Sequence, residues 1–286
     1  MRYIFFGTPK FAAIILEKLI EAGIPPVALV CNPDRPAGRK QVITPPPTKL
    51  VARKQKIENR IKVFQPEELD EIHVSLSTLQ PDLFIVAAYA KILPKEILEI
   101  PKLGIIGVHP SLLPKYRGPS PIQSAILAGE KETGVSLFLM DEKLDHGNVV
   151  SSIKYQVSRE ENYETLEKKL AELAGDLLVE ALPKFVKGEI APLPQDESQV
   201  TYTKKFTSEE GFISPEDLEL ATSGASPEKA VEIHQKTRAL NPEPGVWTIK
   251  DTKRIKLLET ELQNYKLLLK RIQESGKKSS DYAKQF

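Results

Sequence analysis

His109 and Asp145 are the two residues of this chain whose side chains suggest acid–base chemistry. His109 ends a short apolar stretch, residues 105–108, and is followed by a loop dense in proline and glycine. This order predicts a strand with His109 at its carboxyl end, which is where ligands bind in open α/β sheets. Asp145 stands farther along in a Leu-Asp-His-Gly turn. Taken singly, the two residues have a more ordinary interpretation, as a histidine that caps a strand and an aspartate that shapes a turn.

The elements that must position these two residues follow an α/β pattern. Residues 2–6 are apolar and β-prone, Gly7-Thr8-Pro9 predicts a tight turn into a helix, and residues 27–30 predict a second strand. A strand, a helix and a strand joined by a short glycine turn open a doubly wound sheet. We therefore expect a Rossmann-like domain, with further strands near 61–64, 82–88, 134–140 and 149–157 and helices near 69–79, 121–129 and 165–185.

The last third of the chain is typical of a smaller, separate domain. Residues 191–199 have the proline and polar bias of an interdomain linker. Ser226-Pro227 predicts a helix start, and two short β segments follow at 254–258 and 266–272. These segments suggest a small OB-like β-barrel, abridged because few residues separate them. The expected limits are 1–190 for a catalytic domain, 191–206 for a linker and 207–286 for the C-terminal domain.

Composition places the chain among globular proteins of a reducing compartment. Its 286 residues are 41% hydrophobic and 28% charged, enough for one sizeable core and a smaller one. No apolar run reaches the roughly twenty residues of a membrane span, and the first residues lack the apolar run of a signal peptide. The single cysteine, Cys31, excludes an internal disulfide and a zinc cluster. These features predict a cytoplasmic protein in which Cys31 is a buried thiol.

Charge is distributed unevenly along the chain. The net charge is +1, yet between positions 35 and 62 nine lysines and arginines face Glu58 alone, and the chain after Lys250 is again basic. Two basic patches on a nearly neutral protein are either ordinary solvated faces or contacts to a polyanion held at two points. The first patch includes residues 32–47, whose prolines, glycine and charges predict a loop. Loops of this length are functional or disordered.

Several short motifs resemble one enzyme family. Residues 108–118, Val-His-Pro-Ser-Leu-Leu-Pro-Lys-Tyr-Arg-Gly, are similar, nearly residue for residue, to the signature of enzymes that use 10-formyltetrahydrofolate to formylate an amine. Phe-Gly-Thr-Pro at 6–9, Leu-Asp-His-Gly at 144–147 and Asn-Pro-Glu-Pro-Gly within 238–248 resemble other parts of that family. Through Pro-Asp-Arg-Pro-Ala-Gly-Arg at 33–39, the chain looks most like the branch that formylates initiator methionyl-tRNA. The resemblance grows thin after about residue 250.

The resemblance implies a role for each of these positions. His109 would donate to the oxyanion of a tetrahedral centre, and Asp145 would orient or charge the imidazole, with the amine proton leaving through Asp145 or water. The co-substrate is 10-formyltetrahydrofolate, and no metal is required. The residues expected to hold its pterin are Ala88, Tyr89, Ala90, Ile92, Leu93, Ser111, Leu112, Leu113 and Pro114. The residues expected to contact the tRNA are Arg35, Arg39, Lys40, Lys277 and Lys278.

Gly107 departs from the family pattern, which has Asn-x-His where this chain has Gly107-Val-His109. Glycine cannot give the second donor that asparagine gives to the formyl oxygen, and loss of one such donor costs about 10²- to 10³-fold in rate. Three interpretations stay open: a slow enzyme in which water fills the gap, an inactivated enzyme, or a neighbour such as Ser111 or Gln123 that takes over. Ala90, where the family has glycine, is a milder departure if its φ is negative.

Two rival functions fit the same residues. One is formylation of a small amine, such as an amino sugar nucleotide or glycinamide ribotide, which the 33–39 motif and the basic C-terminal region argue against. The other is a folate- or tRNA-binding protein that no longer catalyses, which Gly107 favours and the retained His109 and Asp145 oppose. The sequence favours formyl transfer to methionyl-tRNA by a monomer that has no contact with a membrane.

Overall fold

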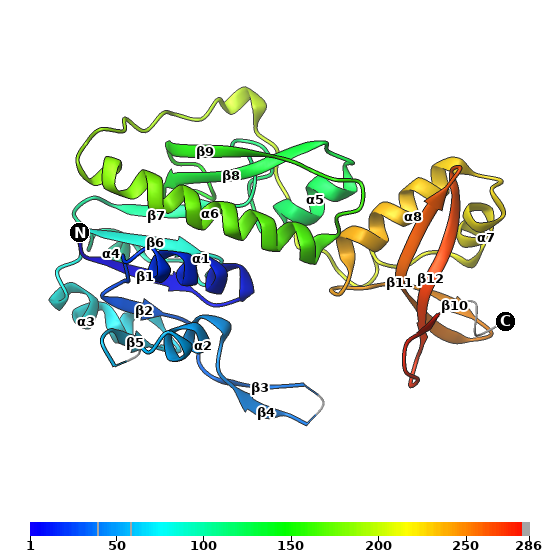
Figure 1. Ribbon diagram of the computed structural model, residues 1–286, viewed down its shortest axis with the longest axis horizontal. Helices are drawn as coiled ribbons and strands as arrows, with labels where there is room; N and C mark the ends of the chain where they lie inside the picture. The colour runs from blue at the N-terminus through cyan, green and yellow to red at the C-terminus, as the bar shows by residue number, and fades with distance from the viewer. Residues whose placement is uncertain (39, 58, 282–286) are drawn as a thin grey trace. The chain divides into compact units, whose positions relative to one another are not determined.

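A seven-stranded sheet forms the centre of the first part of the chain (Figure 1). The computed structural model describes residues 1–38, 40–57 and 59–281. The strands of this sheet are β1 (Tyr3–Gly7), β2 (Ala28–Val30), β5 (Lys62–Phe64), β6 (Leu83–Ala87), β7 (Ile105–His109), β8 (Glu132–Leu139) and β9 (Val149–Gln156). They lie in the order β5-β2-β1-β6-β7-β8-β9.

The strands from β5 to β7 are parallel, whereas β8 pairs with β7 in the antiparallel direction. β1, β2, β6 and β7 are buried along their whole length, which explains why their sequences are continuous apolar runs. The chain extends the sheet to one side of β1 with β2 and β5, and to the other with β6 and β7. The carboxyl ends of β1 and β6 therefore form the switch point of a doubly wound sheet, and the predicted Rossmann-like fold is confirmed.

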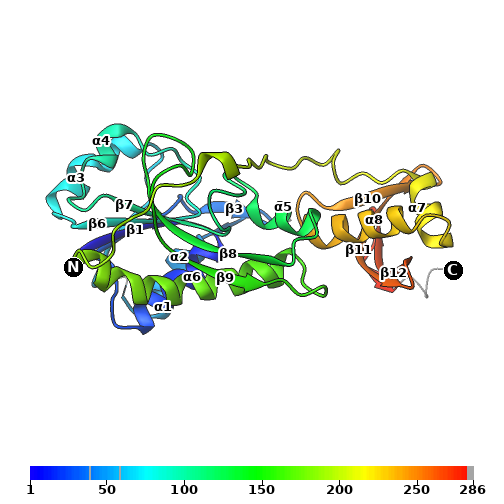
Figure 2. The ribbon, with the colours of Figure 1, turned by 90° about the horizontal axis from the view of Figure 1, so that it is seen from above.

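Helices cover both faces of this sheet (Figure 2). On one face lie α1 (Lys10–Glu21) and α6 (Tyr163–Val186), and on the other lie the 3₁₀ turn η1 (Leu69–Ile72), α3 (His73–Thr78) and α4 (Lys95–Leu98). Leu76 of α3 and Ile97 of α4 share one buried cluster with strand residues such as Phe84. α2 (Pro47–Lys54) packs beside α1. A mostly parallel sheet needs both layers because both of its faces are apolar.

The prediction of an unbroken loop over residues 32–47 is wrong, because the segment contains a hairpin. β3 (Arg35–Ala37) and β4 (Val42–Thr44) pair in the antiparallel direction. All residues of both strands are exposed, so no buried face marked them in the sequence. At the base of the hairpin, the Lys49 ammonium donates to Asp34 Oδ1 at 2.9 Å. The basic segment is therefore an exposed hairpin whose base is held by the contact between Lys49 and Asp34.

The chain divides into two compact units, of which the first comprises residues 1–117, 133–155 and 167–202. The second contains residues 118–132, 156–166 and 203 onward. Its elements are α5 (Pro121–Leu127), α7 (Pro215–Ser223), α8 (Pro227–Leu240), β10 (Val246–Lys250), β11 (Lys253–Gln263), β12 (Lys266–Glu274) and β13 (Ser280–Asp281). Within the described residues these strands form an open antiparallel sheet with β10 and β13 at its edges, which agrees with an abridged barrel. The predicted domain limits stay a prediction.

His234 on α8 makes the stability of the second unit depend on pH. Its Nδ1 lies 2.9 Å from the Thr260 hydroxyl oxygen, and burial lowers the pKa of the imidazole to about 4. In the unfolded chain the imidazole binds a proton below about pH 6.5. Because the unfolded state takes up this proton first, the free energy of unfolding falls as the pH drops from about 6.5 toward 4.

We expect the melting temperature of the second unit, followed by calorimetry, to fall across this pH window in the wild-type protein. His234→Gln, which cannot titrate there, is the matched variant and should give a flatter curve. Two curves of equal slope would contradict the assignment to His234.

Candidate active site

His109 lies at the carboxyl end of β7, and its side chain is buried. The ring atom Nε2 lies 2.8 Å from the carbonyl oxygen of Tyr116. A carbonyl oxygen can only accept, so Nε2 carries a hydrogen and donates it. This bond fixes the ring and turns the other nitrogen, Nδ1, toward Asp145.

Asp145 reaches His109 although its loop begins beside the opposite end of strand β7. β8 is antiparallel to β7, with Leu139 opposite Ile106, so β8 ends beside the start of β7. The loop at 141–147 then folds back, and Asp145 Oδ2 lies 3.6 Å from His109 Nδ1, with side chains 18% and 7% exposed. This separation is within ion-pair range and longer than a hydrogen bond. The two side chains predicted to be catalytic are thus brought together.

Gly107 lies on the same face of β7 as His109, and the space beside it is filled. Phe138 stands opposite Gly107 on β8 and is buried. A Cβ added to Gly107 would lie 2.5 and 2.6 Å from Cε1 and Cζ of the Phe138 ring and 3.0 Å from Met140 Cγ. Such approaches are closer than protein packing permits. The ring of Phe138 therefore occupies the position that a Cβ at residue 107 would take.

Ser111, one of the two groups considered as a substitute donor, is engaged in its own loop. Its hydroxyl donates to the Lys115 carbonyl at 2.6 Å, and its carbonyl accepts from the Ser136 hydroxyl at 2.8 Å. The Leu113 amide donates to the same Ser136 oxygen at 3.0 Å. The other group, Gln123, belongs to α5 in the second unit. The hydroxyl of Ser111 thus serves the turn that follows His109.

The predicted pterin segment follows β6 at the switch point of the sheet, next to β7. Its residues Ala88 and Ala90 are exposed. Ala88 has a φ of +47°, whereas Ala90 is not among the described residues with positive φ. The condition under which alanine can replace glycine at position 90 is therefore met.

Side chains of the two predicted pterin segments differ in exposure. The ring of Tyr89 packs edge-on against Phe6 at 5.6 Å, and its hydroxyl is buried with no hydrogen-bond partner among the described residues. Ile92 is 94% exposed, whereas Leu93 is buried. Residues 112–114 are half-buried. The exposed aliphatic side chain of Ile92, beside the switch point, is a group that a bound ligand would cover.

The hairpin carries the first group of residues predicted to contact tRNA. Arg35 begins β3, and its guanidinium lies 2.5 Å from a carboxylate oxygen of Glu67, with both side chains more than half exposed. Lys40 is exposed in the hairpin turn, and Arg39 lies outside the described residues. Exposed ion pairs contribute little, so a phosphate can replace Glu67 as the partner of Arg35.

The second group lies near the end of the described chain, in the second unit. Lys277 lies 2.8 Å from a carboxylate oxygen of Glu274, and Lys278 is exposed. Both lysines follow β12. Their exposure is compatible with contacts to a polyanion.

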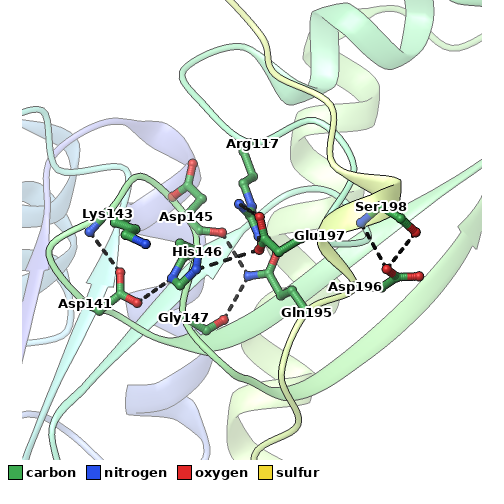
Figure 3. Close-up of polar contacts among 10 residues, drawn as sticks. All are labelled: Arg117, Asp141, Lys143, Asp145, His146, Gly147, Gln195, Asp196, Glu197 and Ser198. Carbon is green, nitrogen blue, oxygen red and sulfur yellow. Dashed lines mark hydrogen bonds and ion pairs between the residues drawn. The ribbon is translucent and has the colours of Figure 1, made fainter.

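A buried arginine that was not predicted as a site residue bonds to the predicted linker, which in turn bonds to the Asp145 loop through Gln195 (Figure 3). Arg117 is 1% exposed, donates to Gln195 Oε1 at 2.8 Å and lies 2.7 Å from Glu197 Oε1. Gln195 Nε2 donates in turn to the Asp145 carbonyl at 2.9 Å. The Arg117 guanidinium holds the pKa of Glu197 below its usual range. The sequence carries no signal that separates Arg117 from exposed arginines, and Gln195 and Glu197 stand in a stretch typical of a linker.

Three further observations limit the chemistry of the described residues. No three His, Cys, Asp or Glu side chains in the described part of the chain gather as metal ligands would. Burial raises the pKa of the Cys31 thiol to about 11, so this cysteine is a protonated core residue rather than a nucleophile. Across residues 1–38, 40–57 and 59–281, no helix combines the length and apolarity that crossing a bilayer requires.

Both parts of the chain match known protein families. The family described as formyl transferase matches residues 1–182, and the one described as formyl transferase, C-terminal domain, matches residues 227–277. A methionyl-tRNA formyltransferase of Chloroflexus aurantiacus is 42% identical over 250 residues, which cover 87% of this chain and 76% of that protein. One of Kosmotoga olearia is 42% identical over 259 residues, which cover 90% of this chain and 78% of that protein.

The fold also has a counterpart among solved structures. The methionyl-tRNA formyltransferase from Clostridium thermocellum superimposes with a TM-score of 0.60 and is 18% identical. The match covers 96% of this chain and 99% of that chain. At this identity the similarity establishes the shared fold.

Proposed function

Because this chain belongs to the formyl transferase family, we propose that it transfers the formyl group of 10-formyltetrahydrofolate to the amino group of initiator methionyl-tRNA. The resemblance seen in the sequence motifs is confirmed by relatives that are 42% identical and carry the name methionyl-tRNA formyltransferase. The observation in the structure that supports the proposal most is the pair His109 and Asp145 at the edge of the sheet that holds the switch point.

The reaction needs a group that stabilises negative charge and a group that takes a proton. The amine nitrogen attacks the formyl carbon, the carbonyl oxygen becomes an oxyanion, and the bond from carbon to the folate nitrogen breaks as the oxygen's electron pair returns. The attacking nitrogen loses one proton and the folate nitrogen gains one. We assign stabilisation of the oxyanion to a hydrogen on His109 Nδ1, which requires the imidazolium form because Nε2 already donates to the Tyr116 carbonyl. We assign to Asp145 the roles of orienting the imidazole and accepting the amine proton. The low exposure of both side chains supports these roles, because a dry site strengthens both interactions.

The two segments after β6 and β7 are the proposed pterin site. Exposed Ile92 is the side chain that folate binding would cover. Folate is a co-substrate in this scheme, and no step uses a metal. We further propose that the protein acts as a monomer in the cytoplasm, where methionyl-tRNA enters translation.

Formation of formylmethionyl-tRNA from 10-formyltetrahydrofolate, measured with the purified protein, tests the proposal directly. Methionyl-tRNA should be formylated, whereas an amino sugar nucleotide and glycinamide ribotide at the same concentration should not be. Formylation of a small amine in preference to methionyl-tRNA would reject the proposed substrate.

The hairpin residues give a prediction about tRNA binding. We expect Arg35→Ala and Lys40→Ala each to weaken methionyl-tRNA binding and to reduce the slope of log affinity against log salt by about one, because each removes one phosphate contact. Filter binding over a series of salt concentrations measures this slope. Lys102→Ala, an exposed lysine before β7 and outside both basic groups, is the matched control. An unchanged slope in all three variants would mean that the hairpin does not contact the tRNA backbone.

One observation favours a second candidate function. Phe138 fills the space beside Gly107, which suits a protein that binds folate and methionyl-tRNA without transferring the formyl group. Binding of both ligands with no formylated product, in an assay where an active formyltransferase gives product, would select this candidate.

A further inference from the structure

Residues 193–202, part of the predicted linker, belong to the first unit and are hydrogen-bonded at both ends to other segments of it. The backbone groups of Leu193 and Val149 exchange two hydrogen bonds of 2.7 and 2.9 Å. The Thr201 hydroxyl accepts from the Tyr116 amide at 2.8 Å, and the Thr201 carbonyl accepts from the Arg117 amide at 2.9 Å. A segment bonded in this way has a fixed position on the first unit, and we call it the strap.

The strap supports both members of the catalytic pair. At one end Thr201 holds Tyr116, whose carbonyl accepts the hydrogen of His109 Nε2 at 2.8 Å. At the other end Gln195 Nε2 donates to the carbonyl of Asp145 at 2.9 Å (Figure 3). One continuous segment therefore bonds to the loop that holds the imidazole and to the loop that carries the carboxylate.

The side-chain amide of Gln195 bonds through both its oxygen and its nitrogen, and the bonding partners determine which atom faces which side. Arg117 has only donors, so the Gln195 oxygen faces it and accepts from Nε and Nη2 at 3.1 and 2.8 Å. The carbonyls of Asp145 and Gly147 only accept, so the Gln195 nitrogen faces them at 2.9 and 2.8 Å. Arg117 is held in turn by Glu197. The loop is thus tied through one amide group to a buried guanidinium.

Besides the bonds to Gln195, the Asp145 loop has a contact of 2.6 Å between His146 Nδ1 and Asp141 Oδ2, and His146 Nε2 lies 3.7 Å from Glu197 Oε1 of the strap. The first four residues of the loop, 141–144, are exposed, and Leu144 is 58% exposed. Asp145 itself has a φ of +47°, a left-handed conformation that non-glycine residues keep only when their surroundings enforce it. On the premise of the proposed function, we infer that Gln195 is a positioning residue for Asp145 and that the strap holds the carboxylate beside His109.

The substitution Gln195→Glu keeps the contact with Arg117 and removes the two hydrogen bonds to the Asp145 loop. The new carboxylate still accepts from Arg117, but it has no donor for the loop and places negative charge against two carbonyl oxygens. Since two ordinary hydrogen bonds are lost, we expect kcat to fall by about 10- to 100-fold while KM for methionyl-tRNA and for 10-formyltetrahydrofolate stays within about twofold. Steady-state formylation assays measure both parameters.

Asp196→Ala is the matched control in the strap. Asp196 is the next residue, and its carboxylate caps the following turn by accepting from the amide and hydroxyl of Ser198 at 3.0 and 2.7 Å. We expect its kcat to stay within about twofold of the wild-type value, since the Asp196 carboxylate bonds to Ser198 within the strap rather than to the loop. Equal losses in both variants, or a wild-type kcat in Gln195→Glu, would overturn the inference.

Hydrogen exchange in the Asp145 loop of the full-length protein tests the same inference without turnover. The amides of residues 141–147 should exchange about tenfold faster in Gln195→Glu than in the wild type or in Asp196→Ala, because the loop loses its two hydrogen bonds from the residue 195 side chain. Equal exchange rates would overturn the inference whatever the activity. Faster exchange together with a wild-type protein that transfers no formyl group would retain the positioning role and reject the proposed function.

Discussion

Replacing His109 with alanine is expected to lower kcat for formylation of methionyl-tRNA by about 10²- to 10⁴-fold. The imidazole is buried, is fixed through Nε2 to the Tyr116 carbonyl, and faces Asp145 at 3.6 Å. Alanine removes the group assigned to the oxyanion and leaves the carboxylate without the ring it orients. Because this interaction belongs to the transition state, KM should change little. Single-turnover formylation at saturating substrate measures the chemical step directly.

Two further variants test whether His109 and Asp145 act as a unit. His73→Ala, at the start of α3, is the control for loss of a histidine outside the site and should keep its kcat. Asp145→Asn keeps the shape of the side chain but removes its charge, and the variant lacking both groups should be no slower than the slower single variant. Losses that multiply would mean that the two residues act independently, which would contradict the assigned roles.

The sequence predicted the sheet and the place of His109 because both depend on local, strongly apolar segments. Buried parallel strands are continuous apolar runs, and β1, β6 and β7 have this pattern. A histidine directly after such a run, before a proline-rich loop, must lie at the carboxyl edge of the sheet. The pairing of His109 with Asp145 came from resemblance to a family, since the sequence alone does not show that the loop after β8 folds back across the sheet.

The features that sequence analysis missed depend on contacts between distant residues or on exposed backbone. The β3–β4 hairpin has no buried face, so its composition indicated only a loop. The strap looks like a linker because its bonds use backbone groups and the polar side chain of Gln195. The burial of Arg117 follows from partners about eighty positions away in the chain, Gln195 and Glu197. No local pattern distinguishes such residues from solvated ones.

Gly107→Asn alone is expected to destabilise the protein and to leave kcat no higher than that of the wild type. A Cβ at position 107 would lie 2.5 and 2.6 Å from two carbons of the Phe138 ring, so the asparagine must push a buried ring aside. Overpacking of this kind costs about 1 to 3 kcal/mol. Thermal unfolding measures the loss of stability, and the formylation assay measures kcat.

Phe138→Leu removes the two ring carbons that block position 107 and keeps an apolar side chain in the core. By itself it should cost about 1 to 2 kcal/mol of stability, whereas Gly107→Asn made in its background should cost less than in the wild type, with a coupling of about 0.5 to 3 kcal/mol. If asparagine then supplies the missing donor, kcat of the double variant should exceed that of Phe138→Leu by about 10²- to 10³-fold.

A single Gly107→Asn variant of unchanged stability and raised kcat would contradict the prediction, because it would mean that the Phe138 ring moves aside without a measurable loss of stability. A stable double variant with no gain in kcat would mean that the missing donor does not limit the reaction, and the candidate that only binds folate and methionyl-tRNA would then be preferred.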